Sequence, residues 1–233
     1  TQAHQRYRLR PTSDWPKGEI VPGVTTILDG QLGWNKRVLM AWSRREALKG
    51  NDPDAMAQEA ADSGTVSHKL VEAHIKGVEA DLKDFTQNQI DAGKTGFSAF
   101  LDWEKDNQLE YDHIEYPVVS EKHRYGGTID MIAHKDGSLW LIDLKTSSGI
   151  WPEMKCQVAA YSMAFEEQDR RQIHEWHILK LDKKDGSFQH HKLSNVKRDI
   201  LVLGEKRNMS EIDVAWETFL SARKLYDLQK ELK

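Results

Sequence analysis

The sequence predicts an α/β protein in which helices flank a mixed central sheet of about five strands. Three observations carry this prediction. Apolar residues in the first part of the chain recur with the period of a helix. After Gln108 the pattern changes to short runs rich in Ile, Val, Leu and Tyr, which favour strands. Residues 194–233 then return to a helical pattern.

Residues 1–110 are expected to form an N-terminal helical region after a short extended segment. Residues 20–28 place β-branched side chains around a Pro-Gly pair. A helix expected over residues 35–50 begins at an asparagine, which is a good capping residue. A longer helix over residues 53–77 begins with a proline, which is favoured at the first helical position. A third helix is expected over residues 85–107.

Residues 111–193 are expected to hold the sheet, and residues 194–233 to form C-terminal helices. The core segments are strands over residues 111–119, 127–133, 139–145, 174–181 and 188–193, with a helix over residues 152–167. No internal repeat and no low-complexity linker interrupts the chain. Residues 1–233 are therefore predicted to form a single domain.

Composition excludes several classes of protein. The 233 residues are 39% hydrophobic and 30% charged, which is typical of a soluble globular protein. The single cysteine, Cys156, excludes a disulfide framework, a cysteine-based zinc site and an iron–sulfur cluster with four cysteine ligands. No apolar run approaches the ~18–20 residues of a membrane-spanning helix, and the first residues lack the apolar centre of a secretory signal. We expect a cytoplasmic protein without a membrane partner.

Asp136-Gly137 between two apolar runs is the strongest short-range sign of a two-residue β-hairpin turn. With these residues as the turn, Asp130 lies directly opposite Asp143 on the neighbouring strand. Side chains alternate along a strand. The residues expected on one face are Thr128, Asp130 and Ile132 on the first strand and Leu141, Asp143 and Lys145 on the second.

Two carboxylates that face each other across a sheet repel, so a cation is expected between Asp130 and Asp143. Lys145 is one candidate, and a divalent metal bound by oxygen ligands is another. The hairpin alone is explained equally well by a solvated sheet face or by an ordinary Asp–Lys ion pair.

His68 continues an apolar stripe of the helix over residues 53–77 and is expected to face inward with it. The stripe comprises Met56, Ala60 and Gly64. A lone histidine on an apolar helix face is usually a core residue. Here His68 is also placed to offer a neutral imidazole to the same metal.

Gln157 and Tyr161 lie four residues apart and therefore share one face of the helix that follows the hairpin. One interpretation is that they pack this helix on the sheet. The other is that they form a polar pair that orients Lys145 or a substrate phosphate.

Four short motifs now stand in a fixed order along the chain. They are Gly64-xxx-His68, Gly127-xx-Asp130, Asp143-Leu-Lys145 and Gln157-xxx-Tyr161. Together they resemble the RecB-like nuclease branch of the PD-(D/E)XK superfamily. Residues 24–28 and 143–147 are also similar to phage-encoded exonucleases and the mitochondrial genome maintenance exonuclease. The resemblance covers about residues 20–195 and implies a restriction-endonuclease-like core.

The resemblance implies a metal centre. In such nucleases the residues that match His68, Asp130 and Asp143 bind a divalent ion, here Mg²⁺ or Mn²⁺. The backbone carbonyl at Leu144 is implied as a further ligand. Glu115 resembles an auxiliary acidic position of some relatives.

The same resemblance implies roles for three other side chains. Lys145 orients or activates the attacking water and neutralises charge near the phosphate, and Gln157 and Tyr161 support this lysine or the nucleic-acid backbone. Some relatives hold an iron–sulfur cluster, but Cys156 by itself does not provide the ligands, so no iron–sulfur cluster is expected.

The function implied is that of a metal-dependent DNA exonuclease that acts on single-stranded or end-containing DNA. Three alternatives stay open: a structure- or sequence-selective endonuclease on the same site, a non-catalytic nucleic-acid-binding module, and a metal-dependent hydrolase of a small phosphoester. The resemblance favours a phage-infected or prophage-carrying bacterial cell over a mitochondrial setting and indicates no particular protein partner.

The formal net charge of −4 hides an asymmetry along the chain. Residues 1–50 hold 9 Lys+Arg against 4 Asp+Glu, whereas residues 51–120 hold 5 against 15. The cations and tryptophans gathered in the basic segment are Trp34, Lys36, Arg37, Trp42, Arg44, Arg45 and Lys49. Cations follow a phosphate backbone and aromatic rings stack on unpaired bases. This segment is therefore a candidate DNA path, although a solvated helix face with core tryptophans fits the pattern too.

Overall fold

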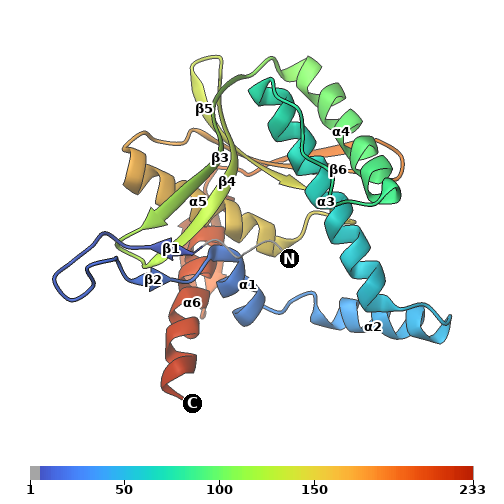
Figure 1. The fold of residues 1–233 in the computed structure, drawn as a ribbon. Helices are drawn as coiled ribbons and strands as arrows, with labels where there is room; N and C mark the ends of the chain where they lie inside the picture. The colour runs from blue at the N-terminus through green and yellow to red at the C-terminus, as the bar shows by residue number, and fades with distance from the viewer. Residues whose placement is uncertain (1–5, 233) are drawn as a thin grey trace.

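The computed structural model describes residues 6–232, and its architecture is the α/β fold that the sequence predicts (Figure 1). The helices are α1 (Val24–Gln31), α2 (Lys36–Leu48), α3 (Pro53–Lys76), α4 (Gln87–Asn107), α5 (Pro152–Asp169) and α6 (Glu211–Glu231). The strands of the central sheet are β3 (Glu110–Ser120), β4 (Tyr125–Lys135), β5 (Ser138–Lys145), β6 (Glu175–Leu181) and β7 (Phe188–Lys192). Two short antiparallel pairs lie outside it: β1 (Tyr7–Arg8) with β2 (Ile20–Val21), and β8 (Arg198–Val202) with β9 (Glu205–Met209).

The central sheet is mixed, with strand order β3-β4-β5-β6-β7. Only β5 and β6 run parallel, because the crossover helix α5 joins them; the other neighbours are antiparallel. Helices α3 and α4 cover one face of the sheet, and α1, α5 and α6 cover the other (Figure 1). The carboxyl ends of the two parallel strands therefore open at one edge between the two helical layers.

The expected hairpin between β4 and β5 is confirmed in turn and in register. Lys135 pairs with Ser138, and the ladder continues without a shift to Met131 opposite Ile142. Both turn residues have positive φ angles, 50° at Asp136 and 76° at Gly137, as this tight turn requires.

The helix α3 begins and ends as expected. Asp52 caps it through hydrogen bonds from the backbone N–H groups of its first turn, and Gly77 ends it in the left-handed conformation. The expected apolar stripe is wrong for the first two turns, because Met56 is 40% exposed and Ala60 is exposed. These turns extend beyond the sheet, as Figure 1 shows, so the sheet does not cover them.

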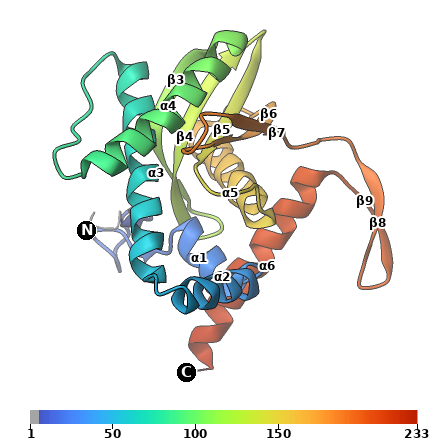
Figure 2. The ribbon, with the colours of Figure 1, turned by 90° about the vertical axis from the view of Figure 1, so that its right-hand side faces the viewer.

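The prediction of helices throughout residues 194–233 is wrong for residues 198–209, which form the β8–β9 hairpin (Figure 2). Its turn residues, Leu203 and Gly204, have φ angles of 51° and 83°. A leucine rarely adopts this conformation, so the first position of the turn lacks the asparagine, aspartate or glycine that usually signals such a hairpin. No helix among residues 6–232 combines the length and apolar composition needed to cross a membrane.

Candidate metal and phosphate site

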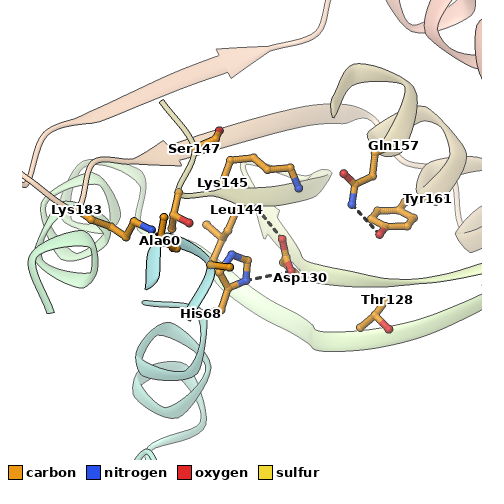
Figure 3. Close-up of a pocket in the computed structure, with 12 residues that line it drawn as sticks. Ala60, His68, Thr128, Asp130, Leu144, Lys145, Ser147, Gln157, Tyr161 and Lys183 are labelled. Carbon is orange, nitrogen blue, oxygen red and sulfur yellow. Dashed lines mark hydrogen bonds and ion pairs between the residues drawn. The ribbon is translucent and has the colours of Figure 1, made fainter. Parts of the chain in front are cut away.

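A pocket of about 460 Å³ opens at the carboxyl end of β5, between the helices α3 and α5 (Figure 3). Its polar lining contains most of the side chains that the sequence predicts for the catalytic and metal site, together with Thr128. They are His68 from α3, Thr128 and Asp130 from β4, Lys145 from β5, and Gln157 and Tyr161 from α5. The tertiary structure thus brings together four motifs that are far apart in the chain.

Three side chains in this region offer ligand atoms to a cation. The nitrogen of His68 and carboxylate oxygens of Glu115 and Asp130 all lie within 4.8 Å of one another. The closest measured pair joins Nδ1 of His68 to Oδ1 of Asp130 at 3.4 Å (Figure 3). Two carboxylates and one imidazole form a donor set suited to Mn²⁺ or Mg²⁺.

Asp130 also accepts a hydrogen bond from the backbone N–H of Leu144, with an N···O distance of 2.7 Å. The regular β4–β5 ladder ends just before this point, at Met131 and Ile142. A side-chain carboxylate therefore occupies the place where the next backbone pairing would lie. The Leu144 carbonyl as a metal ligand stays a prediction.

The strict alternation expected along β4 does not hold through Asp130. Ile129 packs in the core with α5, whereas Met131, two residues later, packs in the core under α4. The neighbouring strand β3 behaves in the same way, since Ile114 and Tyr116 contact opposite cores. Between these two lies Glu115, whose φ angle of 51° departs from the extended conformation of a strand. This irregularity turns Glu115 and Asp130 toward α3 and His68.

Asp143 lies outside that group of three. It is 1% exposed, and its Oδ2 atom lies 2.6 Å from Nζ of Lys145. The sequence analysis expected either Lys145 or a divalent metal to balance the charge of the opposed carboxylates. The ion pair with Lys145 is the first of these two possibilities. Lys145 lines the pocket, so it connects the buried Asp143 with the side where His68 and Asp130 lie.

The pKa values of the acidic and histidine side chains in the site are shifted from their usual ranges. Burial and the neighbouring Asp130 raise the pKa of Glu115 to about 7. Burial also raises the pKa of Asp143 to about 6, although Lys145 opposes this change. Burial by itself lowers the pKa of His68, but the attraction of Asp130 is stronger and the pKa is raised overall. Burial raises the pKa of Asp130, but the attraction of His68 is stronger and the pKa is lowered overall. Such an excess of closely spaced acidic groups is relieved by a bound cation.

The expected pairing on α5 is present. Nε2 of Gln157 donates to the hydroxyl of Tyr161 at 2.8 Å, and both side chains line the pocket (Figure 3). The ring of Tyr161 occupies the space above Gly127, where an added Cβ would lie 2.2 Å from Cε1 of the ring. On α3, Gly64 makes room for the side chain of Thr146 in the same way, because a Cβ there would lie 2.5 Å from Oγ1 of Thr146.

The basic and aromatic residues of the first segment belong to α2 and the residues directly before and after it, and none of them lines the pocket. Figure 1 places α2 beside the start of α3, where it stands apart from the sheet. Trp34 is 49% exposed and the cations of the helix face solvent, so this surface is open to a ligand. Its role in DNA binding stays a prediction.

Sequence reasoning missed two polar residues at or beside the pocket, Tyr7 and Lys183, and it gave Thr128 a face of the sheet but no contact. The hydroxyl of Tyr7 lies 3.1 Å from Oγ1 of Thr128, and its ring packs where Gly126 lacks a side chain. The glycine pair 126–127 was the available sign, because adjacent glycines in a buried strand indicate close approach of other groups.

Comparison with known proteins identifies no family. No family model and no curated protein matches the chain. A solved structure titled "Crystal structure of SSO0001" is similar over 71% of this chain and 72% of that one, with 10% sequence identity and a TM-score of 0.33. A likeness this weak carries no argument about function.

Proposed function

We propose that the chain is a metal-dependent deoxyribonuclease, an exonuclease that hydrolyses phosphodiester bonds of single-stranded or end-containing DNA. One observation carries the proposal. The ligand atoms of His68, Glu115 and Asp130 converge within 4.8 Å, and the adjoining pocket also holds a lysine that is paired with a buried carboxylate. A polar site of this composition suits a phosphate ester, because it combines acids that hold a cation with a cation of its own.

The donor set fits Mg²⁺ or Mn²⁺, with the imidazole favouring Mn²⁺. When bound, such an ion acidifies a coordinated water and neutralises charge on a phosphate oxygen. His68, Glu115 and Asp130 would hold it. Asp143 and the Leu144 carbonyl, which the sequence resemblance implies as ligands, lie on the adjacent strand and remain part of the proposed centre.

Lys145 supplies the second element of the proposal. Asp143 holds its ammonium at 2.6 Å, which limits the positions that the long side chain can adopt. The remaining N–H groups of Lys145 are then available to orient a water molecule or to stabilise a non-bridging phosphate oxygen. Gln157 and Tyr161 form the opposite side of the pocket and limit where the phosphate can lie.

The exposed surface of α2 supports DNA as the substrate rather than a small phosphoester. Its four cations are Lys36, Arg37, Arg44 and Arg45, and Lys49 follows the helix directly. Its one acid, Glu46, is buried and already held by Lys49 and Asn51. Exposed cations next to exposed tryptophan and leucine side chains suit a flexible, unpaired strand better than a small substrate.

A nuclease assay tests the proposal. End-labelled single-stranded, duplex and circular DNA are incubated with Mg²⁺ or Mn²⁺, with and without EDTA. We expect nucleotides or short oligomers from linear DNA, no cutting of closed circles, and complete loss of activity in EDTA. Cutting of circles would replace the exonuclease with an endonuclease on the same site.

The site assignment has its own test. Asp143→Ala and Lys145→Ala are expected to abolish cleavage and to retain DNA binding. Asp112→Ala is the matched control, because Asp112 is an acid of the same sheet that pairs with Arg171 and does not line the pocket. Equal cleavage by the wild type and both pocket variants would refute the assignment.

A further inference from the structure

Lys183 is a pocket residue that none of the four motifs contains. It follows β6 in the turn to β7, and it lines the pocket together with Lys145 at the end of β5 (Figure 3). The two strands are parallel, and Lys145 stands opposite Lys180 in their register. Lys145 and Lys183 therefore reach the same edge of the sheet from the ends of neighbouring strands.

Two glycines on the neighbouring helices α3 and α4 make room for the Lys183 side chain. A Cβ at Gly96 would lie 3.3 Å from Cγ of Lys183, and a Cβ at Gly64 would lie 3.6 Å from its Nζ atom. The ammonium donates to the backbone carbonyl of Ala60 in α3. These contacts restrict the conformation of the Lys183 side chain, although the residue itself lies in a turn.

Within residues 6–232, Lys183 has no carboxylate partner within ion-pair distance. The nearby Asp182 is paired instead with Lys180, at an Nζ···Oδ2 distance of 3.1 Å, and it also accepts from the backbone N–H of Lys184. The Ala60 carbonyl takes one of the three N–H donors of Lys183 and, being neutral, does not balance its positive charge. A half-buried ammonium with unused donors at the edge of a pocket suits an anionic ligand.

We propose that Lys183 is a phosphate-binding residue of this site, which contacts a DNA phosphate next to the one that is hydrolysed. The inference rests on the proposed function, since it needs a polyanionic substrate. Lys145 has the position beside the acidic group, whereas Lys183 lies on the α3 side of the same pocket. A DNA strand that places one phosphate at the acidic group brings its neighbouring phosphate to a second cation, and Lys183 provides it.

The test measures how DNA binding depends on salt. The Asp143→Ala background prevents cleavage, and a single-stranded oligonucleotide in Mg²⁺ is the probe. Adding Lys183→Met is expected to weaken binding about tenfold and to reduce the slope of log K against log salt by about 0.7, the value for one lost phosphate contact on a single strand. Lys184→Met is the matched control, because Lys184 is the next residue of the same turn and is exposed outside the pocket.

Lys183→Gln separates charge from structure. Glutamine keeps an N–H donor for the Ala60 carbonyl but removes the charge, so it is expected to lower the slope as Lys183→Met does. Lys183→Arg is expected to keep the slope. Thermal melting of each variant checks that α3 stays in place.

The outcomes for this inference and for the proposed function are distinct. If the wild type cleaves DNA and the Lys183→Gln and Lys184→Met variants show the same salt slope, Lys183 does not bind phosphate and the nuclease proposal stands. If the wild type neither cleaves nor binds DNA, both proposals fall. A lower slope for Lys183→Gln alone, in a protein that cleaves, supports both.

Discussion

Two groups of histidine and acidic side chains flank the β5–β6 region, and they are built in opposite ways. The first is the pocket group of His68, Glu115 and Asp130. The second, here called the paired-histidine cluster, consists of Glu175, His177 and His190 with Trp103 and Trp140. Each group has imidazole next to a carboxylate, but only the first opens to a pocket.

In the paired-histidine cluster, hydrogen bonds run from Trp103 through His190 to His177. Nε1–H of Trp103 donates to Nδ1 of His190 at 3.2 Å, which leaves the proton of that ring on Nε2. His190 then donates to Nδ1 of His177 at 2.9 Å, and Nε2 of His177 lies 3.2 Å from Glu175. The ring of His177 also stacks on Trp140 at 4.0 Å. Burial, with nearby cations, lowers the pKa of His177 to about 3, so both rings stay neutral and serve the fold.

The pocket group pairs His68 with Asp130 and holds a second acid, Glu115, beside them. Glu115 and Asp130 are two acids with one imidazole between them, and burial raises the pKa of Glu115 to about 7. The comparison indicates that residue type does not distinguish a ligand site from a structural one. The distinction lies in whether neighbouring groups already use the hydrogen bonds and the charge.

The largest expected difference between the two groups is in catalysis. Asp130→Ala removes a proposed metal ligand and is expected to lower the cleavage rate about a thousandfold. His177→Ala should leave the rate per folded molecule unchanged, because His177 is 1% exposed and lies outside the pocket. Single-turnover cleavage of an end-labelled oligonucleotide measures both. Similar losses in the two variants would remove the distinction.

For the free energy of unfolding, we expect the larger loss in the paired-histidine cluster rather than in the pocket group. His177→Ala leaves a cavity beside Trp140 and an unpaired donor on His190, which together cost about 3 kcal/mol in the free energy of unfolding. Urea unfolding at neutral pH measures the change. His134→Ala is the control, since this histidine has a side chain that is 44% exposed. A loss no larger than that of the control would mean that the cluster is not structural.

Bound metal should stabilise the protein through the pocket group and not through the paired-histidine cluster. At a Mn²⁺ concentration about 100 times the dissociation constant, the wild type should gain about 2.7 kcal/mol in the free energy of unfolding. The His177→Ala variant is expected to gain as much as the wild type, and Asp130→Ala to gain little. Melting curves with Mn²⁺ and with EDTA give the comparison. Equal stabilisation of Asp130→Ala would place the ion elsewhere.

The smallest expected effect is on acid stability. The pKa of His177 is about 3 in the folded protein and about 6.5 when the chain is unfolded, so the unfolded state binds more protons between these values. The stability that this histidine contributes is present above pH 6.5 and is lost as the pH falls. About 2 kcal/mol should disappear between pH 7.5 and pH 5. Unfolding of His177→Ala over the same range should show a smaller change; an identical slope would contradict the assignment.

Much of the site followed from local rules. The Asp136-Gly137 turn fixes the β4–β5 register, and the four-residue spacing of Gln157 and Tyr161 places both on one helix face, where they hydrogen-bond. These predictions succeed because turn geometry and helical period depend on neighbouring residues alone. The roles of these residues in catalysis remain proposals.

Other features depended on contacts that no local rule contains. The alternation along β4 fails at Asp130, and on the neighbouring strand β3 Glu115 adopts a φ angle of 51°. The β8–β9 hairpin escaped prediction because its turn uses Leu203, a residue that seldom adopts the conformation found there.

The sequence by itself determined the order of helices and strands in the core, the hairpin register, and which side chains are capable of metal and phosphate chemistry. Only the tertiary structure decided which of them meet: Glu115 with His68 and Asp130, Asp143 with Lys145, and Lys183 at the same pocket. The reason is physical. Local propensities set the shape of each element, whereas the packing of α3 against the sheet and the parallel β5–β6 crossover bring distant residues within the few ångströms over which charges and ligands act.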